Sequence, residues 1–378
     1  MAAPASNKDV RQFNRVLVLR ALLARERASQ TELAHELGLS LPTVRQNVCE
    51  LVARGWAREE GLFHSTGGRK ARAFVPVADA RVAVGVDITA SRANLVLVDL
   101  RGAVRGRIVC ERPFSLTDAY FGELGVLVHE LVPAEEWERL CGVGVSLPGI
   151  VSADGSQLTV SHALGLEDVA TDRIAEGLGV PCTFMNDANA AGFAELWSGF
   201  GGLPARHGTL VYLSLSDSVG GSVFHDGALV GGDHQRAGEF GHMTLVPGGR
   251  SCYCGKTGCV DAYCSARMLS SYAAGDLDRF FQMLDEGDAR ARAVWEEYLE
   301  MLAVVVNNLH MALDCDVIAG GYLGSYLHRR GAPLKRLVAA RNTFVSDAGY
   351  LHFSRLGRDA SALGAALSHI EMAIQTLD

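Results

Sequence analysis

Hydrophobic residues in the first 55 positions recur every three or four residues, which is the spacing of helices buried on one face. The pattern predicts a first helix from about Asn7 to Arg25. A second helix begins at a capping box made by Ser29 and Glu32 and stops at Gly38, and a third begins at Ser40. The buried face of the third helix has four predicted members: Val44, Val48, Leu51 and Val52. Two short helices joined by a turn of about three residues form a helix-turn-helix.

The outward positions near the start of the third helix predict contact with DNA. These positions carry Thr43, Arg45, Gln46 and Asn47. Arginine suits guanine edges in the major groove, and glutamine or asparagine suits adenine edges. The alternative is a solvated polar face on an ordinary helical hairpin.

The residues after Gly55 predict a strand, a turn and a second strand, which together make a wing. Arg69 and Lys70 follow two glycines at this turn, where bare backbone approaches phosphates and a guanidinium enters a minor groove. A flexible basic linker is the alternative. The first domain is predicted to end at about residue 80.

Short apolar runs alternate with turns in the remainder of the chain. Strands are predicted at residues 82–88 and 92–99, followed by a turn and a third strand. About 125 residues later, "GTLVYLSLSDSVGGSVFHDGALVGG" repeats this plan, and such duplication predicts two similar α/β lobes. We therefore expect a winged helix-turn-helix at 1–80 and an α/β body. Its first lobe covers 81–195, completed by a C-terminal helix at 360–378, and its second lobe covers 196–359.

Between the repeats, "LCGVGVSLPGIV" predicts a buried strand that ends in a Pro-Gly loop. The segment "VPCTFMNDANAAGFAEL" predicts a further strand that delivers Asn186, Asp187 and Asn189 to the start of a helix. Polar side chains at the carboxyl end of a strand, in a cleft between lobes, are where α/β sheets bind ligands.

Composition and charge narrow the class of protein. The 378 residues are 48% hydrophobic, as a packed globular protein requires, and no charged-then-apolar leader or membrane-length apolar run is present, so we expect a soluble cytoplasmic protein without a membrane partner. The first 80 residues hold 12 Lys and Arg against 8 Asp and Glu, a net charge of +4, whereas the remainder holds 23 against 35, a net charge of −12. A basic head on an acidic body predicts a polyanion partner for the head alone.

The winged helix, the duplicated lobes and the motifs "NDANAAGFAE", "GEFGHM" and "CYCGKTGC" together resemble the ROK family of sugar-responsive repressors and sugar kinases. The resemblance covers essentially the whole chain and implies an actin-like ATPase fold of two α/β lobes. It also implies a sugar pocket, with these residues as ligands: Asn186, Asp187, Glu239, His242 and Asp261.

Two positions depart from the family pattern. Asp261 stands where the family usually has Glu, and the family's Asn-Leu-x-Gly-Trp segment is altered here to "HALGL", His162 to Leu166. The identity of the sugar is therefore left open. Glu239 and Asp187 have an alternative role as helix-start carboxylates that the helix dipole favours.

Four of the nine cysteines lie in the stretch "SCYCGKTGCVDAYCS". Cys252, Cys254 and Cys259 have a C-x-C-x4-C spacing, glycines let the loop turn tightly, and His242 supplies a fourth ligand for a closed, structural zinc site. The resemblance implies the same four ligands and one zinc ion per chain. The alternatives are a reduced surface loop and a strained disulfide between the first two cysteines.

The phosphate-binding hairpins of a ROK kinase are not intact in this chain. The first should resemble D-x-G-G-T, but Asp87 is followed by Ile, Thr, Ala and Ser, and Ser216–Ser218 replace a G-T-G turn with a carboxylate between two hydroxyls. We therefore expect no ATP binding and no kinase activity, with Asp187 a vestigial general base. The segment "IAGGYLG", residues 318–324, is either an adenosine-side loop or a strand-to-helix turn.

Three functions stay open at this stage: a DNA-binding repressor that senses a sugar, an active sugar kinase with an appended DNA-binding head, and a regulator that responds to a non-sugar metabolite or a protein partner. The first is favoured, with an operator duplex and a sugar effector as partners. Family resemblance and paired operator half-sites predict a homodimer or a dimer of dimers.

Overall fold

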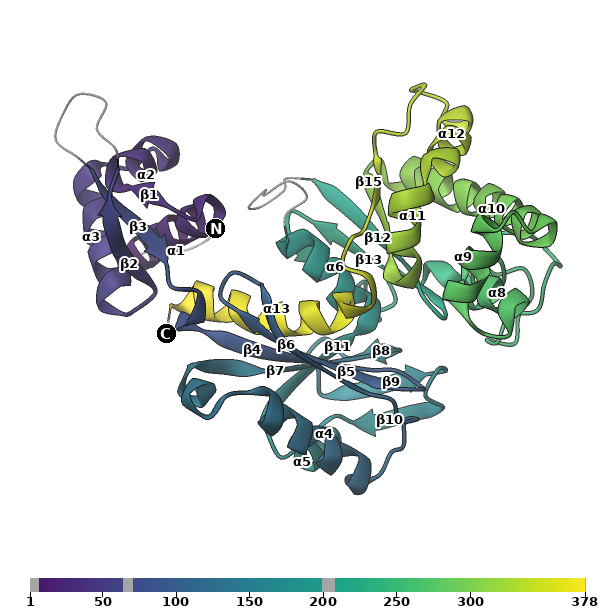
Figure 1. Ribbon diagram of the computed structural model, residues 1–378, viewed down its shortest axis with the longest axis horizontal. Helices are drawn as coiled ribbons and strands as arrows, with labels where there is room; N and C mark the ends of the chain where they lie inside the picture. The colour runs from purple at the N-terminus through teal and green to yellow at the C-terminus, as the bar shows by residue number, and fades with distance from the viewer. Residues whose placement is uncertain (1–6, 64–70, 199–207, 378) are drawn as a thin grey trace.

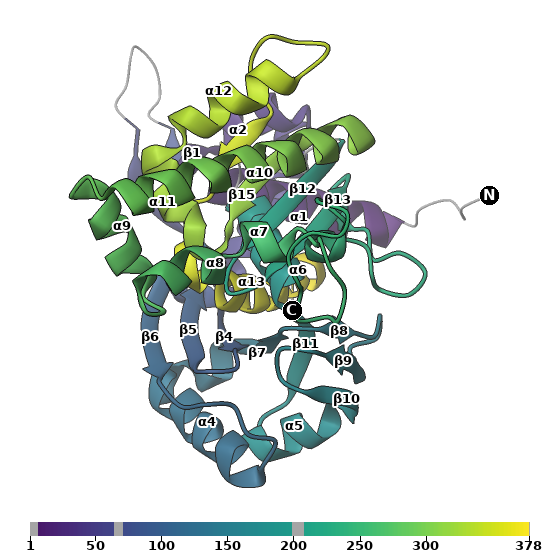
Figure 2. The same cartoon turned by 90° about the vertical axis from the view of Figure 1, so that its right-hand side faces the viewer.

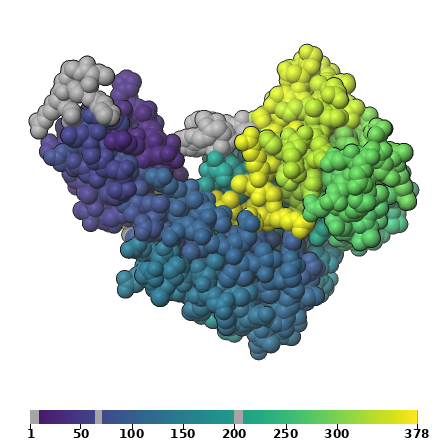
Figure 3. Space-filling model, in the orientation of Figure 1, coloured from purple at the N-terminus to yellow at the C-terminus, as the bar shows by residue number. Residues whose placement is uncertain are grey.

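The computed structural model describes residues 7–63, 71–198 and 208–377. The chain forms a winged helix-turn-helix and two α/β lobes. The winged helix and the second lobe lie at opposite ends of the long axis, with the first lobe and the C-terminal helix between them (Figures 1 and 3). This arrangement has the three parts that the sequence predicts.

The winged helix begins with three helices, α1 (Asn7–Arg25), α2 (Gln30–Leu37) and α3 (Leu41–Ala53). Its sheet has the order β1-β3-β2, with β1 at Ala28–Ser29, β2 at Ala57–Leu62 and β3 at Arg72–Pro76.

Local signals set the helix boundaries of this domain. The Ser29 side chain accepts a hydrogen bond from the Glu32 amide while the Glu32 side chain accepts one from the Ser29 amide, so the predicted capping box is confirmed. Gly38 ends α2 in the left-handed conformation, and Ser40 caps α3. Val52 was expected on the buried face of α3 but is 37% exposed.

The first lobe is built on a five-stranded sheet of order β11-β7-β4-β5-β6. Its strands are β4 (Val82–Ile88), β5 (Ala93–Asp99), β6 (Val104–Cys110), β7 (Leu140–Leu147) and β11 (Cys182–Asn186). A small sheet beside it contains β8 (Ile150–Val151), β9 (Gln157–Ser161) and β10 (Leu166–Ala170). Four helices accompany these sheets: α4 (Asp118–Leu131), α5 (Asp172–Leu178), α6 (Asp187–Trp197) and α13 (Ala360–Thr376).

Alternation along β5 divides the apolar side chains of the first lobe between two cores. Leu95 and Leu97 face α4 and α5, whereas Val96 and Val98 face α13. A strand points successive side chains to opposite faces, so both faces of this sheet are covered and every residue of its central strands β4 and β5 is buried.

The second lobe repeats this topology. Its sheet has the order β14-β13-β12-β15-β16, in which three antiparallel strands are followed by two parallel ones, as in the first lobe. The strands are β12 (Thr209–Leu215), β13 (Val219–His225), β14 (Ala228–Leu229), β15 (Asp316–Gly320) and β16 (Leu351–Phe353). The helices are α7 (Asp261–Cys264), α8 (Ala266–Ser270), α9 (Leu277–Asp285), α10 (Ala289–Leu313), α11 (Gly324–Arg330) and α12 (Ala332–Arg341). The shared topology confirms the internal duplication.

Helices α6 and α13 lie between the two lobes (Figure 2). Their backbones touch: a Cβ added to Gly364 on α13 would stand 1.7 Å from the Ala190 carbonyl oxygen on α6. Glycine is therefore required there, because any side chain would push the two helices apart.

The far end of α13 joins the winged helix. Trp56 and Leu377 lie in the same continuous apolar core, and both are fully buried. The Arg20 guanidinium pairs with Glu371, and Arg54 Nη1 donates to the Leu377 carbonyl oxygen at 2.7 Å. The winged helix is thus packed onto the body and not tethered by a free linker.

No helix in the described part of the chain is both long and apolar enough to cross a membrane.

Candidate functional site

Two of the four α3 side chains predicted to contact DNA, Arg45 and Gln46, are exposed, and Thr43 is half-buried. Asn47 differs from the prediction. It is only 5% exposed, and its Nδ2 donates to the Thr43 carbonyl oxygen at 2.9 Å. Position 47 lies three residues after Val44 on the helix, so it shares the buried face, and the outward orientation expected for Asn47 is wrong.

The wing after α3 is the antiparallel pair β2 and β3. Arg69 and Lys70, which we predicted to contact DNA at its turn, lie outside the described residues. The structure therefore shows the strands of the wing, whereas its basic turn stays a prediction.

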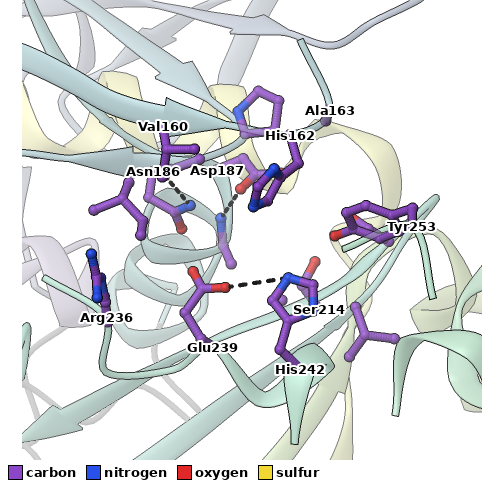
Figure 4. Close-up of a pocket in the computed structure, with 17 residues that line it drawn as sticks. Val160, His162, Ala163, Asn186, Asp187, Ser214, Arg236, Glu239, His242 and Tyr253 are labelled. Carbon is purple, nitrogen blue, oxygen red and sulfur yellow. Dashed lines mark hydrogen bonds and ion pairs between the residues drawn. The ribbon is translucent and has the colours of Figure 1, made fainter. Parts of the chain in front are cut away.

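A cavity of about 370 Å³ lies between the two lobes, within the size range of small-molecule sites. Four of the five predicted sugar ligands line it: Asn186, Asp187, Glu239 and His242. The first two come from the start of α6, and the other two come from the loop after β14, so both lobes contribute (Figure 4).

Asn186 and Asp187 are held by the first turn of α6. The Asn186 Oδ1 accepts a hydrogen bond from the Asn189 amide at 2.9 Å, and its Nδ2 donates to the Gly149 carbonyl oxygen at 2.8 Å. Asp187 Oδ1 accepts from the Ala188 amide at 2.9 Å. These bonds support the alternative helix-start role and also fix both side chains at the edge of the cavity.

The carboxyl of Asp187 holds a proton more tightly than an ordinary aspartate. Burial, and next the negative charge of Asp87, raise its pKa to about 7, and Glu239 adds to the rise. The amide of Ala188 opposes the shift. At neutral pH this carboxyl can therefore either donate a hydrogen bond to a ligand oxygen or accept one from a ligand hydroxyl.

His242 joins the cavity to the cysteine loop. Its Nε2 lies 3.9 Å from Glu239 Oε2, whereas its Nδ1 is buried with no hydrogen-bond partner among the described residues. The ligand atoms of His242, Cys252, Cys254 and Cys259 all lie within 4.8 Å of one another. The unpartnered nitrogen and three converging thiols make a group that can hold a metal ion.

One thiol pair of the cysteine loop has the spacing expected of two ligands of a tetrahedral thiolate site. Cys254 Sγ and Cys259 Sγ are 3.8 Å apart, the spacing of about 3.8 Å that two Zn–S bonds of roughly 2.3 Å give at a tetrahedral angle. Gly255 and Gly258 have positive φ of 84° and 81°, so the loop turns as the sequence predicts. Cys264 is fully buried on α7, outside this group.

Asp261 is the predicted ligand that the structure does not bring into the cavity. It is 5% exposed, and its Oδ2 accepts a hydrogen bond from the Val219 amide at 2.6 Å. The short side chain is therefore used to hold the start of β13. This corrects the expectation that Asp261 faces the sugar.

The cavity lining also contains residues that were not predicted as ligands, among them His162, Arg236 and Tyr253. The rings of His162 and Tyr253 both approach His242, with centroid distances of 6.5 and 5.5 Å. His162 lies in the altered "HALGL" segment, which is the one sequence signal that pointed to it. Tyr253 lies between two cysteines of the metal motif, and Arg236 lies just before "GEFGHM". No feature of the sequence pattern indicates that either one faces a cavity.

Comparison with known protein families matches residues 83–371 to the ROK family and residues 14–58 to winged helix-turn-helix DNA-binding domains. The chain belongs to the ROK family. It is 27% identical over 270 residues to a protein described as a "putative xylose repressor" from Caldicellulosiruptor sp. (strain Rt8B.4), a match that covers 69% of this chain and 66% of that protein. It is 30% identical over 297 residues to an N-acetylmannosamine kinase from Escherichia fergusonii, covering 75% of this chain and 97% of the kinase.

Two solved ROK structures share the fold. A ROK family transcriptional regulator, a homologue of the E. coli MLC protein, superposes with a TM-score of 0.72 at 18% identity and covers 97% of each chain. A ROK glucokinase from Streptomyces griseus, in complex with glucose and AMPPNP, superposes with a TM-score of 0.60 at 22% identity. The match covers 76% of this chain and 98% of the glucokinase chain. The regulator thus matches the winged helix as well as both lobes.

The first hairpin and the "IAGGYLG" loop, which belong to different lobes, are in contact through side chains. The Arg92 and Arg358 guanidinium carbons lie 5.5 and 5.0 Å from the centroid of the Tyr322 ring. Arg92 lies in the turn of the first hairpin, and Tyr322 lies in the "IAGGYLG" loop, so the contact joins the two lobes. Burial, and next the charges of Asp87 and Asp217, raise the pKa of Tyr322 to about 12.

The second hairpin is also engaged with this loop. The Ser216 hydroxyl accepts a hydrogen bond from the Tyr322 amide at 3.3 Å, and a Cβ on Gly321 would stand 2.6 Å from the same hydroxyl oxygen. The Ser216 hydroxyl is therefore already hydrogen-bonded within the protein, to the loop that contains Tyr322.

Proposed function

We propose that this ROK protein is a DNA-binding transcriptional regulator, a repressor, whose interlobe cavity binds a sugar or sugar derivative and thereby alters operator binding. The observation that carries the proposal is the continuous packing from cavity to DNA-binding domain. Asn186 and Asp187 begin α6, α6 packs against α13 at Gly364, and α13 shares a core with the winged helix. The winged-helix family match and the repressor relative support the same function.

The DNA-binding surface in this proposal is the exposed start of α3 with the basic turn of the wing. Arg45 and Gln46 are suited to base edges, while Arg69 and Lys70 are suited to phosphates or a minor groove. We further propose a homodimer, because paired winged helices bind two operator half-sites and a ligand can change the spacing between them.

The cavity would hold sugar hydroxyls through the amide of Asn186, the carboxyls of Asp187 and Glu239, and the imidazole of His242. We propose one structural zinc ion on His242, Cys252, Cys254 and Cys259. Zinc would fix the imidazole so that its other nitrogen is held at the cavity wall, near Glu239.

Kinase activity is not part of the proposed function, although kinase relatives match the body of the chain. Two features support this: the first hairpin lacks the glycines of the kinase pattern, and Arg92 and Arg358 lie against the Tyr322 ring beside the two hairpins. In the second hairpin, the carboxylate of Asp217 would lie beside a bound triphosphate and repel it.

Selection of duplexes from a random-sequence pool tests the DNA-binding function. We expect enrichment of a defined site, with an affinity that falls steeply as salt rises, and loss of enrichment in the Arg45→Ala variant. Failure of the wild-type chain to enrich any sequence would contradict the proposal. Sugar-dependent release of ADP in a coupled assay, lost in Asp187→Ala, would establish a kinase instead.

A further inference from the structure

We propose that the effector is an anionic sugar derivative, with a carboxylate or phosphate group that Arg236 binds at one end of the interlobe cavity. This inference rests on the proposed sugar-sensing function and names the chemical class of its ligand. A neutral sugar would use the hydroxyl-binding groups already described and would leave Arg236 without a role.

Arg236 lines the cavity and is solvent-exposed, and its guanidinium has no ion-pair partner among the residues that the structure describes. Elsewhere the described arginines are commonly matched to carboxylates, as Arg250 is to Glu297 at 2.7 Å. An unmatched guanidinium at a cavity wall offers a planar set of donors that fits a carboxylate or phosphate in two parallel hydrogen bonds.

The cavity has two chemically different ends (Figure 4). Tyr253 and His242 stand at one side, and Arg236 stands at the other, with Asn186 and Glu239 between them. Glu239, three residues after Arg236, also lines the cavity, but its carboxylate lies toward His242, 3.9 Å from Nε2. The guanidinium is therefore left available to a ligand.

The acids of the cavity restrict where a negative group can bind. Asp187 and Glu239 raise the free energy of any anion placed between them. Arg236 supplies a positive charge on the side of the cavity away from His242 and Tyr253. A pendant carboxylate or phosphate at the Arg236 end, with the sugar ring among the hydroxyl-binding groups, satisfies both constraints. The anionic group would then orient the ring in the cavity.

Matched pairs of ligands test this inference on the full-length protein. The neutral members are glucose, N-acetylglucosamine and xylose; the anionic members are glucose 6-phosphate, glucuronate, N-acetylglucosamine 6-phosphate and xylose 1-phosphate. Thermal shift screens the set, and isothermal titration calorimetry measures the affinities of the hits. The variants are Arg236→Gln, Arg236→Lys and, as a matched control for charge, Arg173→Gln on the exposed surface of α5.

We expect an anionic ligand to bind at least about tenfold more tightly than its neutral twin, which is the value of a charge-assisted hydrogen bond. Arg236→Gln should remove this preference, Arg236→Lys should keep part of it, and Arg173→Gln should leave it unchanged. The carboxylate and phosphate members distinguish a sugar acid from a sugar phosphate. Higher salt should weaken the anionic ligand and not the neutral one.

Two outcomes overturn the inference and are distinguishable. Equal binding of neutral and anionic twins, or a preference that survives Arg236→Gln, refutes the role of Arg236 and leaves sugar sensing intact. Silence of the wild-type protein toward every sugar in the set refutes the proposed sensing function itself and removes the basis of this inference with it.

Discussion

Replacement of Asp87 by Asn should stabilise the protein at pH 8 and have a smaller effect as the pH falls. Asp87 is 6% exposed, and Ser146 Oγ donates to its Oδ1 at 2.7 Å. Burial raises the pKa of this carboxyl to about 6 from an ordinary value of 3.8, although the Ser146 bond and the charge of Arg92 lower it. Asparagine keeps an oxygen that can accept the Ser146 bond and has no charge to bury.

The sign and size of the effect follow from proton linkage. Since the folded pKa is above the unfolded one, protonation of Asp87 stabilises the fold fully below about pH 4, and this stability is lost as the pH rises through 6. A rise of roughly two in the pKa of Asp87 corresponds to about 3 kcal/mol in the free energy of unfolding. Asp87→Asn should therefore raise the free energy of unfolding by up to about 3 kcal/mol at pH 8 and by about half of that at pH 5.

Urea unfolding followed by circular dichroism at pH 8, 7, 6 and 5 measures this difference, with Asp233→Asn, at an exposed position, as the control. The control should show no pH-dependent gain. A variant that is less stable than wild type at pH 8 would show that the Asp87 charge is stabilised in the fold by more than its burial costs, and the linkage argument would then be wrong.

The remaining predictions concern the metal group, the helix contact and the DNA-binding face. Cys259→Ser should abolish bound zinc in elemental analysis and lower the melting temperature; equal metal content in variant and wild type would exclude the proposed site. Gly364→Ala should destabilise the chain by several kcal/mol in urea unfolding, roughly the cost of overpacking, because its Cβ would stand 1.7 Å from the Ala190 carbonyl oxygen. Arg45→Ala should weaken DNA binding in anisotropy titrations with an unchanged melting temperature, since Arg45 is exposed. Asn47→Ala should instead lower stability by about 1 to 2 kcal/mol, because Asn47 is buried and its amide donates to backbone. The reverse pattern for this last pair would contradict the orientation of α3.

The sequence predicted the elements of the fold well wherever the signal was local. The capping box at Ser29 and Glu32, the stop at Gly38 and the repeated hairpins each depend on residues close together in the chain, and the structure has all of them. The spacing of Cys252, Cys254 and Cys259 likewise brings three thiols into one loop. Local chemistry is sufficient in these cases because no distant segment has to be placed first.

Orientation and partners were less predictable, since they depend on segments far apart in the chain. Asn47 looks like a DNA contact by residue type, but its helical phase buries it with Val44. Asp261 looks like a sugar ligand by its place after the cysteines, but its shorter side chain bonds the Val219 amide, 42 residues earlier. Arg236 becomes a cavity residue only when the two lobes are put together.

The same long-range packing gives the proposed regulator its means of communication. A ligand can shift an equilibrium only if it binds one arrangement of the lobes better than another. The cavity is lined by side chains from both lobes, so the fit of a ligand depends on the relative position of the lobes. One of these side chains, Asn186, also caps α6. Because α6 and α13 touch backbone to backbone at Gly364, they cannot slide past one another without a steric cost, and we expect α13 to move with α6. Its far end is held to the winged helix by Arg20 and by the buried Leu377, so we expect a displacement at the cavity to be passed on to the DNA-binding domain.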